Sequence, residues 1–360
     1  MNDAQVMLQV LKGSFGANKT YWVSRPVKKG IILFFPGDQL EHALAPPEIR
    51  RLQDPKVQAQ LMASKFAGCS SVVVMPSRLE GSFACFDHFL NRVTRSGEPL
   101  GYQGASLKAS SQIASLLQAG CPTCDNKEMI YHLVGFSKGG VVLNQVLTEA
   151  AACWEQSRNH ADLGSIPLQV TNFIRQLGEL HFLDAGLNCR GAHLTDPQVL
   201  HTLSKAMQDT APGLSIHLHG TPRQWDDEKR PWVRQEKVQF QALLERNGVV
   251  VIEHKSSPFP AQRFSAPDSS PLSNKPLADP FLQMLSMSPK TFPGEKAIPQ
   301  IQSTSARSTA SSSTPNSWPQ PSANSAPHKE FVPKQQTYGF DGPRETRAVP
   351  TKSGQAVAGN

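Results

Sequence analysis

Six short apolar runs constrain the fold of this 360-residue chain more than any other feature of its sequence. Each run is four or five residues long and consists largely of Val, Ile, Leu and Phe, as expected for strands buried on both faces of a parallel sheet. The runs cover residues 31–35, 71–75, 130–134, 180–183, 214–218 and 249–252.

Segments with helical periodicity separate these runs. In each segment apolar residues recur every three to four positions, as on one face of a helix, and Asp196 is the predicted cap of the third. Strands that alternate with helices form right-handed β-α-β units, so the sequence predicts an α/β fold with a doubly wound, mostly parallel sheet. The helical segments cover residues 103–119, 138–152, 197–208 and 231–247.

The composition changes after residue 256. Residues 257–360 contain 16 of the 29 prolines together with 17 serines. A segment with so few apolar side chains cannot bury enough surface to offset its chain entropy, so we expect a disordered C-terminal tail. The predicted organisation is an N-terminal extension (1–29), the α/β domain (30–256) and this tail (257–360), which we expect to recruit any protein partners.

Charge and hydropathy exclude some classes of protein. The net charge is +7, but no dense block of Lys and Arg stands out, so we expect no nucleic-acid partner. No apolar run approaches the roughly 18 residues of a membrane span, and we expect no transmembrane segment. Five basic residues against one acid in residues 1–30 give a weak indication of a mitochondrial address.

The cysteines predict neither a metal nor a cofactor. Six of them are scattered through the domain, as expected of free thiols in a reducing compartment. Cys121 and Cys124 have CxxC spacing, but no second pair or clustered histidine completes a zinc site, and the pair precedes a strand. We interpret it as a loop feature. The six are Cys69, Cys85, Cys121, Cys124, Cys153 and Cys189.

The run at 130–134 leads directly into Gly135-Phe-Ser-Lys-Gly139, which we call the Ser137 corner. A strand before the motif and an apolar helical segment after it are the context of a nucleophile elbow, in which a strained turn exposes the serine hydroxyl. Side chains two residues to either side would collide, hence Gly135 and Gly139. The alternative is a glycine-rich or anion-binding turn, although the spacing of a P-loop is absent.

An elbow serine needs hydrogen-bond donors for an oxyanion. The backbone N–H of Lys138 would point into such a site at the start of a helix. A second donor would come from the loop after the first strand, at Gly37 or Asp38. A carboxylate would repel a developing oxyanion, so Asp38 must point away, or the site performs something other than ordinary acyl transfer.

An elbow serine also needs an acid and a base. Asp184 follows the strand after the elbow and Asp227 follows the next one, so either could orient a histidine; as alternatives, Asp184 is a turn former and Asp227 a first-turn acid. His254 ends the last strand and is the predicted base, unless it is only a surface residue. Other histidines considered for this role are His193, His217 and His219, whereas His328 falls in the tail.

Several blocks together resemble a eukaryotic family of largely uncharacterised α/β-hydrolase-like proteins whose human member has an open-reading-frame name from chromosome 2. The resemblance covers roughly residues 30–255 and implies an α/β-hydrolase-like fold, a mitochondrial location and a link to respiratory-chain upkeep, without a substrate. Ser137 matches the elbow serine of the family, and both candidate aspartates match family aspartates. The blocks are Phe35-Pro-Gly-Asp38, Ser77-Arg-Leu79, Phe83-Ala-Cys-Phe-Asp87, GFSKG with Val141-Val-Leu-Asn-Gln145, Leu183-Asp-Ala-Gly186, Thr221-Pro-Arg-Gln224 and Arg230-Pro-Trp232.

One departure from the family bears on its function, and three functional hypotheses stay open. The family carries a histidine before a phenylalanine near its C-terminus, where this chain has Arg263 before Phe264. The first hypothesis is a serine hydrolase that cleaves an ester, thioester or amide through Ser137, His254 and Asp184 or Asp227, without a cofactor. The second is an inactive protein that keeps the fold for binding or scaffolding. A binder of acidic ligands or of nucleic acid is a third hypothesis, which predicts a steep loss of binding with salt.

Overall fold

The computed structural model describes residues 5–25, 30–41, 43, 45–121, 129–158, 166–209 and 213–255. The predicted C-terminal tail lies outside the described residues, so its disorder stays a prediction. Within the described part, no helix combines the length and the apolar character that crossing a membrane would require.

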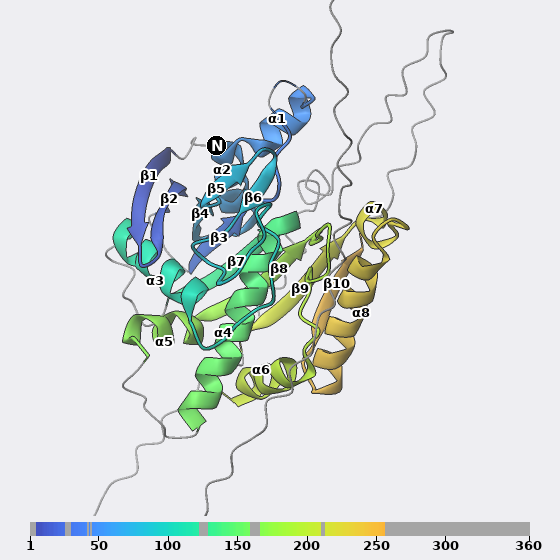
Figure 1. The fold of residues 1–360 in the computed structure, drawn as a ribbon. Helices are drawn as coiled ribbons and strands as arrows, with labels where there is room; N and C mark the ends of the chain where they lie inside the picture. Colours follow the sequence, from blue (N-terminus) through green and yellow to red (C-terminus); the bar gives the residue numbers. More distant parts are fainter. Residues whose placement is uncertain are drawn as a thin grey trace, which may run out of the picture. The chain divides into compact units, whose positions relative to one another are not determined.

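An eight-stranded sheet organises the described part, with strand order β1-β2-β4-β3-β7-β8-β9-β10 (Figure 1). β2 pairs antiparallel with both β1 and β4, and the other neighbours pair parallel. This order with a reversed second strand is that of α/β-hydrolases. It confirms the predicted fold class, and each of the six predicted strands is present. The strands are β1 Val6–Gly13, β2 Gly16–Val23, β3 Gly30–Phe35, β4 Cys69–Val74, β7 Ile130–Phe136, β8 Leu177–Leu183, β9 Ser215–Gly220 and β10 Val251–Lys255, with a small separate sheet of β5 Arg78–Glu80 and β6 Phe83–Cys85.

Helices cover the two faces of the sheet unequally. Because side chains alternate along a strand, Ile31 and Leu33 of β3 belong to the core cluster that includes residues of α3, α4, α6 and α8. Ile32 and Phe34 belong to the cluster that includes residues of α1 and α2. The predicted cap is present, since the Asp196 carboxylate accepts the N–H of the second residue of α6 at 2.9 Å. The helices are α1 Pro47–Gln53, α2 Pro55–Lys65, α3 Lys108–Gly120, α4 Gly140–Arg158, α5 Leu168–Arg175, α6 Pro197–Asp209, α7 Pro222–Trp225 and α8 Pro231–Arg246.

Residues 6–23 form β1 and β2 and extend the sheet at one end. The sequence predicted these residues as part of an N-terminal extension. The apolar side chains of β1 are largely exposed, among them Leu8 (55%) and Val10 (65%). An edge strand with one open face lacks the continuous apolar run of a buried strand, which is why the pattern did not reveal it.

The described cysteines differ in state. Cys69, Cys85, Cys153 and Cys189 are free thiols, as predicted. Cys121 is disulfide-bonded, which corrects the expectation of a free thiol at that position.

Candidate functional site

The Ser137 corner has the geometry of a nucleophile elbow. β7 ends at Phe136, a single 3₁₀ turn covers Ser137–Gly139, and α4 follows directly. Ser137 has φ +51°, the left-handed conformation that residues other than glycine rarely adopt. A Cβ on Gly139 would overlap the carbonyl oxygen of Phe35, and one on Gly135 would lie 2.8 Å from the Gly140 Cα. The two glycines are therefore required by the tight turn.

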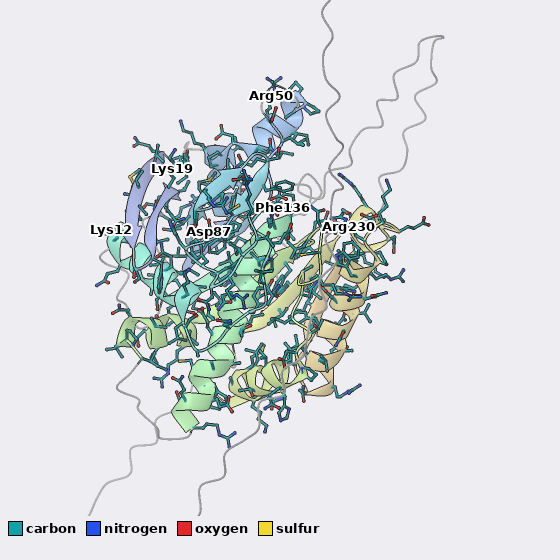
Figure 2. All side chains as sticks on the ribbon, viewed as in Figure 1. Lys12, Lys19, Arg50, Asp87, Phe136 and Arg230 are labelled. Atoms are coloured by element: carbon teal, nitrogen blue, oxygen red, sulfur yellow. The ribbon has the colours of Figure 1, made fainter. Side chains whose placement is uncertain are left out.

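Ser137 lines a cavity of about 310 Å³ at the carboxyl ends of the parallel strands, which we call the carboxyl-end cavity. Loops that follow β3, β7, β8 and β9 all contribute to it, as expected where the strand order changes direction in an open α/β sheet. Figure 2 shows Phe136 and Arg230, two of the lining residues, toward this end of the sheet. The lining residues are Pro36, Gly37, Asp38, Gln39, Leu40, Ile49, Leu52, Gln53, Gln58, Phe136, Ser137, Asp184, Arg223, Gln224 and Arg230.

The Asp38 carboxylate is compensated by a neighbouring lysine. It accepts the backbone N–H of Ala84 at 2.8 Å and lies 3.5 Å from the ammonium of Lys138. The Lys138 side chain is 1% exposed, donates to the Ser96 carbonyl at 2.6 Å and lies 3.4 Å from Glu98. The carboxylate expected to repel an oxyanion is thus directed at a buried cation, which removes the objection raised by its position in the sequence.

The backbone of Gly37 packs directly against the nucleophile. A Cβ on Gly37 would lie 2.7 Å from the Cβ and 3.2 Å from the Oγ of Ser137. In the same loop the N–H of Gln39 is already bound to the Ser82 carbonyl at 2.8 Å. The backbone of Gly37 therefore lies beside Ser137, and its role as an oxyanion donor stays a prediction.

Asp184 and Asp227 have different surroundings. Asp184 follows β8 with φ +45°, is 9% exposed and accepts the N–H (2.7 Å) and hydroxyl (2.9 Å) of Thr221. It lines the carboxyl-end cavity together with Ser137. Asp227 instead accepts from the Arg230 guanidinium at 2.8 Å, which lowers the pKa of its carboxyl group. The structure brings Asp184, and not Asp227, to the cavity of the nucleophile.

The predicted base, His254, is not brought to Ser137. It lies in register with His219 on β9, Leu183 on β8 and Phe136 on β7, so three strand spacings of about 4.8 Å separate it from the end of β7. Its Nε2 lies 3.2 Å from Nδ1 of His217, and its ring stacks on that of His219. The cavity-lining residues that the structure describes include no histidine.

The alternative bases are also engaged elsewhere. His217 and His219 join His254 and His181 in what we call the histidine cluster, on the face of the sheet that carries α2. His193 is buried on the opposite face against Phe182 and Phe240. Burial lowers its pKa to about 3, so it is neutral at physiological pH.

Sequence reasoning missed two arginines that line the cavity, Arg223 and Arg230. Arg230 donates to the side-chain oxygen of Gln224 at 3.0 Å, and the Gln224 amide fills the space that a Cβ on Gly186 would need. The position of Arg223 could have been inferred from the sequence, because it follows the end of β9 by three residues. The carboxyl ends of parallel strands meet at one edge of the sheet.

The chain is similar to known proteins over this region. A model of the C2orf69 family matches residues 105–250. "Mitochondrial protein C2orf69 homolog" of Mus musculus is 31% identical over 123 residues, which are 34% of this chain and 29% of that protein. The Danio rerio protein of the same name is 29% identical over 246 residues, or 62% of this chain and 67% of the relative. The chain thus spans less than a third of the mouse relative in its match, and its resemblance to the C2orf69 family is confirmed.

Solved structures with a similar fold are remote. A putative dienelactone hydrolase from Klebsiella pneumoniae aligns with 70% of this chain and 85% of its own, at 11% identity and a TM-score of 0.37. A putative carboxylesterase from Lactobacillus plantarum aligns with 71% and 86%, at 14% identity and the same TM-score. The fold class therefore rests on the strand order described above.

Proposed function

We propose that this chain, a relative of the C2orf69 family, is a serine hydrolase that cleaves an ester, thioester or amide through Ser137. The observation that carries the proposal is the left-handed conformation of Ser137 beside a cavity that it shares with Asp184. Such a conformation costs about 1–3 kcal/mol and is retained chiefly at functional sites. Asp184 has a left-handed backbone as well, so two strained residues lie at one cavity.

In the proposed mechanism the Ser137 hydroxyl attacks the substrate carbonyl and its proton passes to a base that Asp184 orients. The base returns this proton to the alcohol, thiol or amine that leaves as the scissile bond breaks, and water then hydrolyses the acyl group from Ser137. The N–H groups of Lys138 and of Gly37 or Asp38 bind the oxyanion. The described lining of the cavity contains no histidine, so no described residue is assigned as this base.

The two arginines favour a substrate with a negatively charged group. Arg230 is paired with Asp227, whereas Arg223 forms no ion pair with another residue of the described part of the chain. A guanidinium binds a carboxylate or phosphate in a bidentate manner. We therefore propose that the substrate class is an acyl compound with an anionic group a few ångströms from the scissile bond.

The experiment that tests the hydrolase is labelling of the purified full-length chain with a fluorophosphonate, followed by mass spectrometry of the modified peptide. We expect labelling at Ser137, its complete loss in Ser137→Ala and a reduced rate in Asp184→Asn. Ser106→Ala, a substitution in the loop before α3 and away from the cavity lining, is the matched control and should label as the wild type does. Absence of labelling in the folded wild type would contradict a hydrolase.

A second candidate is binding of an anionic acyl ligand without turnover. The lack of a histidine among the described lining residues favours it. It predicts no fluorophosphonate labelling, together with a rise of the unfolding temperature on addition of acyl phosphates. That rise should be lost in Arg223→Ala and kept in Arg234→Ala, whose exposed side chain pairs with Asp226 outside the cavity.

The names of the relatives support a mitochondrial location for this chain. The basic bias of residues 1–30 points the same way. We propose that the chain acts in mitochondria, where its C-terminal tail recruits partners. Imaging of a C-terminally tagged chain beside a mitochondrial marker tests the location, and a diffuse cytosolic signal would contradict it.

A further inference from the structure

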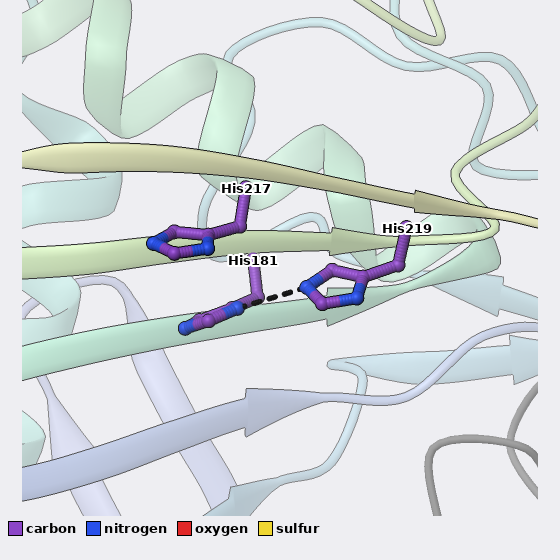
Figure 3. A group of neighbouring side chains, drawn as sticks. All are labelled: His181, His217 and His219. Atoms are coloured by element: carbon purple, nitrogen blue, oxygen red, sulfur yellow. Dashed lines mark hydrogen bonds between the residues drawn. The ribbon is translucent and has the colours of Figure 1, made fainter. Parts of the chain in front are cut away.

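The histidine cluster is a second concentration of chemically active side chains. His181 lies on β8, His217 and His219 on β9, and all three project to the same face of the sheet (Figure 3). One ring nitrogen of each of these three lies within 4.8 Å of a ring nitrogen of the other two. His254 on β10 stacks on His219, with 4.2 Å between ring centroids. The cluster arises because His217 and His219 alternate on one strand and their register places His181 beside them.

The spacing of the nitrogens is close to that of a metal site. His181 Nδ1 and His219 Nε2 lie 3.0 Å apart. Two imidazole nitrogens on one tetrahedral zinc ion, at bonds of about 2.0–2.1 Å, are separated by about 3.4 Å. A small rotation of the two rings would therefore convert their mutual hydrogen bond into two bonds to one ion.

The second nitrogens of two rings are already fixed by oxygen partners. His181 Nε2 lies 3.2 Å from the Glu179 carboxylate, and His217 Nε2 lies 3.1 Å from the Ser215 hydroxyl. Metal-binding histidines typically bond their other ring nitrogen to a carboxylate or similar acceptor, which fixes the tautomer and the orientation of the ring. Of the remaining nitrogens, His181 Nδ1 faces His219 Nε2, whereas His217 Nδ1 lies 3.2 Å from His254 Nε2 and would exchange that contact for a bond to the ion.

The rings are shielded from solvent, since the side chains of His181 and His217 are 2% and 1% exposed. A neutral imidazole binds a metal ion through the one ring nitrogen that carries no proton.

We propose that His181, His217 and His219 form a binding site for a divalent transition-metal ion, best suited to Zn²⁺. Three imidazoles are a known ligand set for zinc, and imidazole donors suit first-row transition metals rather than Mg²⁺ or Ca²⁺. Glu179 orients His181, and His254 stacks on the ring of His219 from β10. The ion would join β8 to β9 on the face opposite α4, separate from the carboxyl-end cavity.

The test uses the tag-free full-length chain after dialysis against a chelator. Titration with Co²⁺ should give the visible absorption of a tetrahedral nitrogen site, and Zn²⁺ should displace it at about one equivalent per chain. X-ray absorption at the zinc edge should show only nitrogen or oxygen neighbours at about 2.0–2.1 Å. This second measurement needs no variant, so it holds even where a substitution prevents folding.

Variants locate the site. His181→Asn and His219→Asn should each abolish stoichiometric binding, and Glu179→Gln should weaken it about 10–100-fold. His201→Asn removes a histidine outside the cluster that bonds to Asn247, and it should bind like the wild type. Cys121→Ser is the control for the CxxC pair and should also retain binding.

Three results would overturn the proposal. The first is absence of binding by the folded wild type at micromolar zinc. The second is unchanged binding in both histidine variants. The third is a sulfur neighbour at about 2.3 Å together with loss of binding in Cys121→Ser, which would assign the metal to the cysteine pair.

Discussion

The Ser137 corner lies at the carboxyl end of β7, whereas the histidine cluster lies on β8, β9 and β10, on the face that carries α2. The corner exposes a hydroxyl to a cavity of about 310 Å³ that contains acids and arginines but, in its described lining, no histidine. The cluster contains four histidines that contact one another. The Ser137 corner therefore has a candidate nucleophile but no described histidine base beside it. The histidine cluster has several imidazoles but does not contain that nucleophile.

The difference shows how position in a parallel sheet determines what a side chain can do. A residue one step past the end of a strand, such as Ser137 or Asp184, projects into the space where loops meet. A residue within the strand, such as His217, projects onto the face of the sheet and packs against its neighbours across the register. His254 lies near the end of its strand, but it still projects onto the face of the sheet as a residue within the strand does.

The largest expected effect concerns Lys138, the buried cation of the Ser137 corner. Lys138→Met leaves Asp38 and Glu98 without their counter-charge, so we expect a loss of about 3–5 kcal/mol in the free energy of unfolding. Urea unfolding measures it. The control Lys255→Met removes an exposed lysine whose pairing with Glu253 should contribute less than about 1 kcal/mol. Equal losses in the two variants would contradict a special role of the buried pair.

A smaller effect is expected when a methyl group is added to a glycine of the tight turn at Ser137. Gly139→Ala places a methyl group against the Phe35 carbonyl, and we expect a loss of about 2–3 kcal/mol from the displaced backbone. Gly213→Ala is the matched control, because a Cβ there meets nothing within 4 Å. Unfolding curves of both variants test this. Full stability of Gly139→Ala would show that the corner can relax, and that Ser137 is not held in its strained conformation by packing.

The smallest expected effect concerns the pH dependence of stability caused by His193, a buried histidine outside the histidine cluster. The pKa of His193 in the folded state is about 3, below the ordinary value of about 6.5. His193 therefore stabilises the fold above pH 6.5, and this contribution is lost as the pH falls toward 3. Between pH 7 and pH 5 we expect the wild type to lose about 2 kcal/mol more than His193→Phe. Chemical unfolding at each pH measures the difference. Parallel pH profiles of the two proteins would contradict it, and the exposed His201→Gln serves as the control.

Much of the fold follows from the sequence because strands buried on both faces leave continuous apolar runs. The same reasoning identified Ser137, since glycine on both sides of a serine between a strand and a helix has a steric cause. β1 was not recognised because its side chains are half exposed, and α1 and α2 lack a strong apolar stripe. Pairing of side chains distant in sequence, such as Lys138 with Asp38, has no local signature.

The histidine cluster shows the limit of sequence reasoning most clearly. Alternation placed His217 and His219 on one face of a strand, but only the register between β8 and β9 brings His181 beside them. Order along the chain suggested His254 as the base, although the register keeps it three strands from the end of β7. Register depends on the packing of the whole sheet, so neither result could be read from local patterns.

The separation of the two regions is tested most directly by the rate at which a fluorophosphonate labels Ser137 in the wild type and in His254→Ala. A catalytic base contributes about 10²–10⁴-fold to such a reaction. Because His254 bonds to His217 instead of Ser137, the account predicts the same rate in both proteins, within about twofold. A loss of about 100-fold or more in folded His254→Ala would show that the cluster supplies the base, and would contradict the account.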